Sequence, residues 1–208
     1  MGFSRSKDKV AIIKDATIDD AYLQHACICK TAVELRNVTN GARLNVPIDI
    51  AALDSNLDHV LLLNDDFEQA ELHPNYARFE HTQIQELTVG SCVVCDLLDH
   101  TKVYRLSVYG DATIRHDASS YATYVQPVGR LTILGCEIEY LDVSGTVIVT
   151  HSHIKTVNLR AGGRLFHYGT KIDSLASCDR TISEGKIKLD DPYVLNLLAM
   201  NEFNYMYG

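Results

Sequence analysis

The segment Cys136-Glu-Ile-Glu-Tyr-Leu-Asp-Val-Ser-Gly145 contains a pattern that recurs along the chain. It begins with a small residue, has apolar residues two, five and seven positions later, and ends in a small residue nine positions after the first. Residues 152–161 repeat the pattern and residues 170–175 repeat its first part. Since apolar and polar residues alternate within each unit, each unit predicts a β-strand with one buried face.

The unit can be traced outward in both directions if its first apolar residue is taken as an anchor. Successive anchors lie 15 to 19 residues apart, at Ile18, Val33, Ile50, Phe67, Ile84, Val103, Ala122, Ile138, Ile154 and Ile172. A period of this length with strand-like alternation inside each repeat is typical of a β-solenoid, in which neighbouring coils bury one another's apolar interior.

Other positions keep the same register. The positions three and five residues past the anchor are mostly apolar, and the positions one and four past it are mostly polar. Two residues before the anchor stand small side chains: Thr31, Thr82, Thr101, Ser120, Cys136, Ser152 and Thr170. Seven past the anchor stand Gly110, Gly129, Gly145 and Ala161, and we expect these glycines to turn the chain out of the strand.

The sequence therefore predicts an all-β protein, a single-chain parallel β-helix (β-solenoid) with coils of about 15–19 residues and a short C-terminal helical cap. Helices are disfavoured because apolar residues recur at two-residue intervals and glycines would interrupt each helix. An antiparallel sandwich is the main alternative, since it also has many short strands. Registered columns favour the solenoid, because a sandwich does not require them.

Three regions are expected. Residues 1–65 form an N-terminal cap or irregular first coils, because Arg36 falls in an apolar column and the runs 12–13 and 61–63 do not fit the register. Residues 66–180 form the solenoid. Residues 181–208 form a cap, with a helix expected from Asp191-Pro192 onward and an aromatic tail after it. The tail either packs on the last coil or contacts a neighbouring subunit through Phe203, Tyr205, Met206 and Tyr207.

The composition is that of a globular protein. Of 208 residues 46% are hydrophobic and 22% charged, and 19 basic against 27 acidic residues give a net charge of −8. Because the basic residues are scattered and the net charge is negative, nucleic acid is not an expected partner. Neither a signal peptide nor a membrane span is predicted, so we expect cytoplasmic synthesis without export and no membrane partner.

No recognised catalytic or nucleotide-binding motif is present. An enzyme site could still be assembled from acids on adjacent coils: Glu139 and Asp173 share one outward column, and Asp142, Glu71 and Asp54 another. Stacked carboxylates could cleave glycosides or bind a cation, although a polar outer column is also what any soluble solenoid needs.

Metal-ligating residues occur in short pairs. His151 and His153 flank Ser152, and at alternate strand positions they would point to the same face and could chelate a metal ion. The pairs Cys27–Cys29 and Cys92–Cys95 could supply zinc ligands, but the second pair would straddle opposite faces of a strand, and the six cysteines are better explained as small reduced core residues. No cofactor is expected.

With its coils, its capped end and no export signal, the chain resembles β-helical proteins of bacteriophage particles, such as tailspikes, spike tips and capsid decoration proteins. The resemblance is architectural and covers residues 67–178. It implies a virion location, and His151 and His153 are similar to the His-x-His pair through which trimeric spike tips bind iron.

The sequence thus favours a non-enzymatic structural or interaction protein, a phage virion component of the capsid-decoration or tail type. Its expected partners are further copies of itself, with a trimer as the working hypothesis, and other structural proteins. The alternatives are a small carbohydrate-active β-helix enzyme that uses outward carboxylates, and a metal-binding module centred on His151 and His153.

Overall fold

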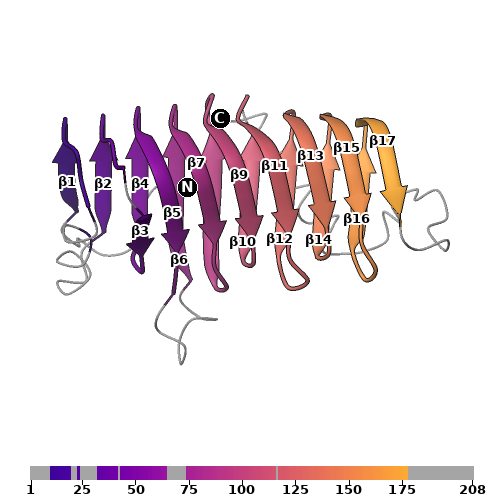
Figure 1. Ribbon diagram of the computed structural model, residues 1–208, viewed down its shortest axis with the longest axis horizontal. Coiled ribbons are helices and arrows are strands. Elements are labelled where there is room, and N and C mark those ends of the chain that lie inside the picture. The colour runs from indigo at the N-terminus through magenta and orange to yellow at the C-terminus, as the bar shows by residue number, and fades with distance from the viewer. Residues whose placement is uncertain are drawn as a thin grey trace, which may run out of the picture.

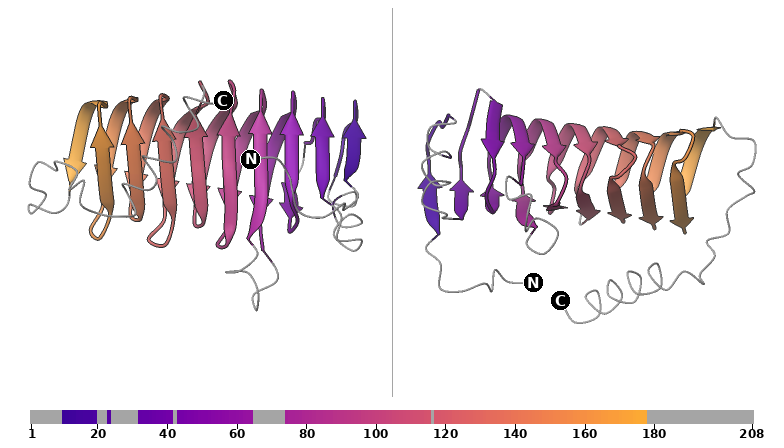
Figure 2. Two further views of the ribbon diagram at one scale, coloured as in Figure 1. Left: turned by 180° about the vertical axis from the view of Figure 1, so that it is seen from behind. Right: turned by 90° about the horizontal axis from the view of Figure 1, so that it is seen from below.

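The protein is a parallel β-solenoid, as predicted, and coil follows coil along its long axis (Figures 1 and 2). The structure is a computed structural model that describes residues 10–19, 23, 32–41, 43–64, 74–115 and 117–177. All named elements of this part are strands, and each lateral pairing between them is parallel. The predicted C-terminal helical cap lies outside the described residues.

From β2 onward, each coil contributes one strand to each of two sheets, and β1 is the first strand of sheet A. Sheet A contains β1 (Ala11–Lys14), β2 (Val33–Arg36), β4 (Ile50–Leu53), β6 (Asn75–Glu80), β8 (Val93–Leu98), β10 (Asp111–Arg115), β12 (Arg130–Leu134), β14 (Thr146–Thr150) and β16 (Arg164–Tyr168). Sheet B contains β3 (Arg43–Val46), β5 (Asn56–Leu62), β7 (Gln83–Val89), β9 (Lys102–Val108), β11 (Ser119–Val125), β13 (Glu137–Val143), β15 (His153–Leu159) and β17 (Lys171–Ser177).

The anchor column predicted from the repeat lies in sheet B. Lateral pairing joins Leu57, Ile84, Val103, Ser120, Ile138, Ile154 and Ile172. The columns three and five residues further on also point inward, and burying them against the interior of sheet A forms one continuous core. Burial of apolar surface is the main favourable term in folding, so these columns determine the register.

The predicted anchor Ala122 is wrong by two residues. Ser120 occupies the anchor position of β11, and Thr123 occupies the next inward position. Both hydroxyl residues are buried, and their side-chain oxygens lie 2.9 Å apart in a hydrogen bond with each other. Because two hydroxyls that satisfy one another can be buried at little cost, this coil has polar residues where the repeat predicts apolar ones. Pro127, which the predicted register places in a strand, lies in the turn after β11.

Two other predicted anchors, Val33 and Ile50, lie in sheet A rather than in the anchor column. In the coil that contains Ile50 the residue in the anchor column is Leu57, which was missed because strands of both sheets show the same alternation. In this register Arg36 points outward beside Glu34, while Ile13 and Leu62 point inward, which accounts for the apolar runs 12–13 and 61–63. The strands β1 to β5 therefore belong to the same two sheets as the later coils.

The corner at which the chain passes from sheet A to sheet B has a left-handed residue, followed in most coils by a small residue and in the coil of β2 by Val38. The residues with positive φ at this corner are Asp15, Asn37, Asp54, His81, Asp99, His100, Asp117, Gly135, His151 and Gly169, and the coil of β8 contributes two of them, Asp99 and His100. In the coil of β14, Ser152 follows His151, donates a hydrogen bond to the carbonyl of Thr150 at 2.7 Å and accepts one from the backbone N–H of Cys136 at 3.1 Å. The ladder of small residues thus satisfies backbone groups at a buried corner.

Glycines stand at the opposite turn, where the chain passes from sheet B to sheet A. Those that closely approach the preceding coil are Gly90, Gly110, Gly129, Gly145 and Gly163, and the last coil uses Gly163 where the repeat predicts Ala161. Their φ angles are not positive. The reason for glycine is space: a Cβ on Gly145 would lie 2.2 Å from the carbonyl oxygen of Gln126 in the preceding coil.

A bend in the strands of sheet B shapes the outer surface. In β9, Tyr104 and Arg105 are consecutive and both face solvent, between the buried residues Val103 and Leu106. The lateral pairing omits Tyr104 and its equivalents in the other coils, because the strand bends there. The bend places two rows of outward side chains side by side along the rod, and these rows carry the candidate site.

Candidate functional site

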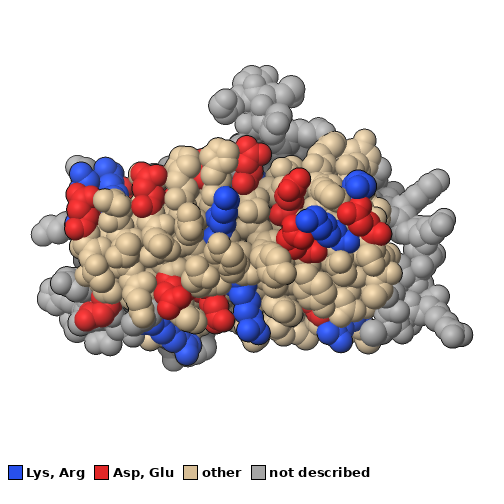
Figure 3. All heavy atoms as spheres, turned by 45° about the horizontal axis from the view of Figure 1, so that its top comes forward, with Lys and Arg blue, Asp and Glu red and all other residues tan. Residues whose placement is uncertain are grey.

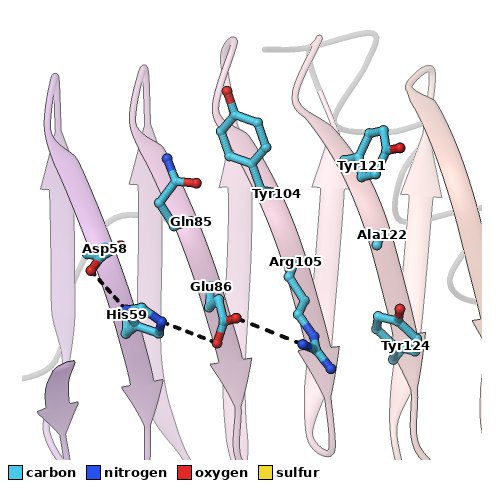
Figure 4. Close-up of a pocket in the computed structure, with 9 residues that line it drawn as sticks. All are labelled: Asp58, His59, Gln85, Glu86, Tyr104, Arg105, Tyr121, Ala122 and Tyr124. Carbon is cyan, nitrogen blue, oxygen red and sulfur yellow. Dashed lines mark ion pairs between the residues drawn. The ribbon is translucent and has the colours of Figure 1, made fainter. Parts of the chain in front are cut away.

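A shallow groove with a volume of about 580 Å³ lies on the outer surface of sheet B. It crosses β5, β7, β9 and β11, so four consecutive coils contribute to it (Figure 4). Its lining residues are Asp58, His59, Gln85, Glu86, Tyr104, Arg105, Tyr121, Ala122 and Tyr124.

Ala122 has the smallest side chain of the residues that line the groove. Lateral pairing places Ala122 between Arg105 of β9 and Tyr140 of β13, so a small residue interrupts a row of large ones. Tyr121 and Tyr104 stand on one side of this gap, 64% and 50% exposed, and Tyr124 lies on the other side (Figure 4). Exposed aromatic rings around a gap form a surface to which another molecule can bind.

Polar side chains form a line along the groove. Nδ1 of His59 lies 3.0 Å from an oxygen of Asp58, and its Nε2 lies 3.5 Å from an oxygen of Glu86. Glu86 also faces the guanidinium of Arg105 at 3.9 Å (Figure 4). The guanidinium carbon of Arg105 lies 5.4 Å from the ring centre of Tyr124, a cation–π contact.

These ion pairs are exposed, and all but the contact of His59 with Asp58 are 3.5 Å or longer, so each contributes little to stability. The groove offers aromatic rings, two carboxylates, an amide, an imidazole and a guanidinium to a ligand. The arrangement is chemically suited to binding through ring contacts and hydrogen bonds.

The next coils carry a tighter cluster, which we call the Asp142 clasp and define as Tyr140, Asp142, Asn158 and Arg160. Asp142 is only 7% exposed and accepts hydrogen bonds from Arg160 Nη2 at 2.7 Å, Asn158 Nδ2 at 2.8 Å and the Tyr140 hydroxyl at 3.1 Å. These bonds, with that of Arg160 the strongest, lower the pKa of the Asp142 carboxyl below its ordinary value. The clasp joins β13 to β15.

The predicted pairs of stacked carboxylates are not assembled within the described residues. Glu139 and Asp173 do share an outward row, but Lys155 lies between them and binds Glu139 at 2.5 Å. Lys171, and next His153, lower the pKa of Asp173. Asp54 stands at a corner rather than in the column of Asp142, and Glu71 lies outside the described residues. Acid catalysis of glycoside cleavage needs a carboxyl held protonated beside a second carboxylate, and Asp142 and Asp173 both favour ionisation.

The two histidines of the predicted chelating pair, His151 and His153, contact different residues and not a common site. His151 lies at the corner in the left-handed conformation and packs edge-on against the ring of Tyr168, with ring centres 5.5 Å apart. His153 begins β15, and its Nε2 lies 2.8 Å from Asp173. The prediction of alternate strand positions was wrong, because the corner falls between the two histidines. Across the described residues, no group of three or more potential ligands is placed to hold a metal ion.

A different pair of histidines, His81 and His100, lies together. They occupy the corner in consecutive coils, and their ring centres are 5.9 Å apart. The repeat register already places them in one column, because each stands directly before a member of the small-residue ladder, Thr82 and Thr101.

The cysteines that the structure describes are free and do not converge on one site. Cys92 lies in the turn before β8, and Cys95 points into the core of sheet A. Burial raises the pKa of Cys95, and it raises the pKa of the Cys136 thiol to about 12. These two thiols stay protonated, as expected of core residues. Cys27 and Cys29 lie outside the described residues, as do the predicted interface residues Phe203, Tyr205, Met206 and Tyr207.

Charge does not gather on the face of the rod seen in Figure 3, where Lys and Arg side chains lie next to Asp and Glu. Pairs such as Lys155 with Glu139 produce this pattern. Among the residues that the structure describes, no helix has the length and apolar character needed to cross a membrane.

The groove was missed in the sequence because the anchor of its last coil was misplaced. With Ala122 as anchor, Tyr121 and Tyr124 fall at unremarkable positions. With Ser120 as anchor, Tyr121 falls in the same outward row as Tyr104, one residue past the anchor. Two tyrosines in one outward row of adjacent coils would have been the signal.

Comparison of the chain with protein-family models, with curated proteins and with solved structures finds no match.

Proposed function

We propose that this protein is a non-enzymatic structural and interaction protein, a rigid rod that associates with further copies of itself through the tyrosine-lined groove of sheet B. The observation that carries the proposal is the exposure of Tyr104 and Tyr121 around the gap at Ala122. Exposed aromatic side chains that are grouped in one groove, unlike single exposed ones, are typical of an interaction surface.

The composition of the groove supports an interface. Tyrosine and arginine are enriched among residues that dominate binding energy, and the groove combines three tyrosines with Arg105. The polar line from Asp58 to Arg105 gives hydrogen-bonding groups at the edge of the aromatic area. An aromatic centre with a polar rim is the usual arrangement of a protein interface.

The scaffold also supports an assembly role. Parallel ladders hold every coil to its neighbours, so outward side chains keep fixed spacing along the rod. Closed homo-oligomers are the commonest assemblies of soluble proteins, and a trimer remains the working hypothesis for this chain. A virion component of a bacteriophage particle, in the capsid or the tail, is the setting that we propose for such a rod.

Catalysis is less well supported, because the carboxylates on the outer face are held in ion pairs. Asp142 is bound by Arg160, and Asp173 by Lys171 and His153.

Light scattering of the untagged protein tests self-association. We expect a mass that is a multiple of the 23.2 kDa chain, and we expect a variant with both Tyr104→Ala and Tyr121→Ala to show the mass of one chain. The matched control is Tyr76→Ala, which removes an exposed tyrosine from sheet A and should leave the mass unchanged. A single-chain mass for the wild type at all concentrations would contradict self-association.

Binding of a glycan in the same groove is a second candidate. The groove places exposed tyrosine rings near the polar side chains of Asp58, Gln85 and Glu86. This combination favours a glycan, because a sugar presents an apolar ring face to an aromatic ring and hydroxyl groups to polar side chains. A glycan array probed with the wild type and with the Tyr104→Ala, Tyr121→Ala variant tests it. Retention of a glycan by a monomeric wild type, lost in the variant, would replace the self-association proposal with this one.

A further inference from the structure

The corner between sheets A and B places a row of polar side chains along the rod. Successive coils contribute Asp54, His81 and His100, each in the left-handed conformation at the end of a strand of sheet A. The backbone N–H of His81 donates a hydrogen bond to the carbonyl of Asp99 at 2.9 Å. Since this bond links the two corners, the side chains of His81 and His100 start from fixed neighbouring positions.

The two imidazoles are close enough to share an ion. Their ring centres lie 5.9 Å apart with an angle of 36° between the planes. A transition metal binds an imidazole nitrogen at about 2 Å, so an ion lying between the rings can contact one nitrogen of each after small side-chain rotations. Both side chains face solvent, so water can complete the coordination.

Asp54 occupies the position of a supporting group. One of its carboxylate oxygens lies 3.9 Å from Nδ1 of His81. Histidine ligands commonly donate the ring N–H that does not bind metal to a carboxylate, which orients the ring. A side-chain rotation that brings this oxygen from 3.9 Å to hydrogen-bond distance of Nδ1 would hold His81 with Nε2 available to the ion.

We propose that His81 and His100 form a two-histidine site for a divalent transition-metal ion that prefers imidazole nitrogen, such as Ni²⁺, Cu²⁺ or Zn²⁺. The bound ion links two consecutive coils at their corner. This site differs from the pair expected from the sequence, because His153 is bound to Asp173 and His151 packs on Tyr168. It does not depend on the tyrosine-lined groove.

Calorimetric titration of the untagged full-length protein with Ni²⁺ tests the proposal. We expect the variant His81→Ala, His100→Ala to lose the site, and each single variant to bind about tenfold more weakly or worse, because the second imidazole binds intramolecularly once the first is engaged. The matched control, His151→Ala with His153→Ala, should bind as the wild type does. All four positions are at the surface or the strand edge, so circular dichroism should show each variant folded.

Nuclear magnetic resonance locates the ion independently. Substoichiometric Ni²⁺ should broaden the imidazole signals of His81 and His100 before those of His151 and His153. Unchanged Ni²⁺ affinity in the His81→Ala, His100→Ala variant, or loss of the site in the His151→Ala, His153→Ala variant, would overturn the proposal.

Discussion

The outer surface of sheet B differs between its two halves, although the same register and core run beneath both. Over β13 and β15, the polar side chains of the Asp142 clasp bind one another at 2.7 to 3.1 Å. Over β5 to β11, the contacts of the groove are mostly 3.5 Å or longer, and Tyr104 and Tyr121 are largely exposed. The clasp uses its side chains to hold coils together, whereas the groove leaves its side chains available to a partner.

The difference shows how a solenoid can separate stability from binding. Interior columns determine the fold in every coil, so the outward rows are free to vary from coil to coil. Where outward residues satisfy each other they add stability, and where they do not they provide a surface for recognition. Substitutions at buried positions should therefore lower stability equally in the two halves, whereas substitutions at outward positions should lower it more in the clasp than in the groove.

The largest expected effect is the same in both halves. Leu141→Asp beneath the clasp and Leu106→Asp beneath the groove each place a charge at a fully buried position and should lower the free energy of unfolding by about 4 kcal/mol or more. Urea unfolding followed by circular dichroism measures this. Glu139→Gln, on the outer surface, serves as control and should change stability by less than about 1 kcal/mol. Tolerance of Leu106→Asp would show that the groove half does not share the core.

A somewhat smaller loss is expected at the glycine turn. Gly145→Ala should cost about 1–3 kcal/mol, because its Cβ would lie 2.2 and 2.3 Å from the carbonyl oxygens of Gln126 and Gly129 and the coils would have to move apart. Gly41→Ala is the matched control, since nothing lies within 4 Å of a Cβ there. Equal melting temperatures for the two variants would contradict the close approach of the coils.

Neutralising one carboxylate should cost more stability in the clasp than in the groove. Asp142→Asn should lower stability by about 1–2 kcal/mol, because Asp142 is nearly buried and accepts charge-assisted hydrogen bonds. Glu86→Gln should cost less than about 0.5 kcal/mol, because its ion pairs are long and exposed. If Glu86→Gln were as damaging as Asp142→Asn, the groove would also be a stabilising cluster.

The stabilising contribution of Asp142 in the clasp should depend on pH. Since the folded state lowers the pKa of Asp142, its contribution is fully present above the unfolded pKa of about 3.9 and is lost as pH falls through the lower folded value. The stability difference between the wild type and Asp142→Asn should be constant from neutral pH to about pH 5 and should shrink below about pH 4. A difference that grew on acidification would contradict the ion pair.

The smallest effect on stability is expected at the centre of the groove. Tyr121→Ala should change the free energy of unfolding by less than about 0.5 kcal/mol, because the side chain is already 64% exposed. It should nevertheless weaken self-association, as measured by the concentration dependence of the scattering mass. A large loss of stability would mean that Tyr121 supports the fold rather than a partner.

The repeat was sufficient to predict the fold class, because interior columns impose period and alternation on the residues themselves. Inward columns at Leu141, Val143 and Val157 and the corner residue Ser152 lie where the pattern places them. The register failed at Ala122, where Ser120 and Thr123 are buried as a hydrogen-bonded pair. A pattern of apolar residues cannot detect an interior position that two hydroxyls satisfy together.

By itself the sequence determined a parallel solenoid with polar outer rows, since burial of apolar side chains acts on every coil alike. Only the tertiary structure decided which outward side chains meet. The alignment of Tyr104 with Tyr121 and of Asp142 with Arg160 depends on the length of each turn and on the exact corner of each coil. Such contacts join residues of different coils, and their positions follow from backbone hydrogen bonds that no local pattern records.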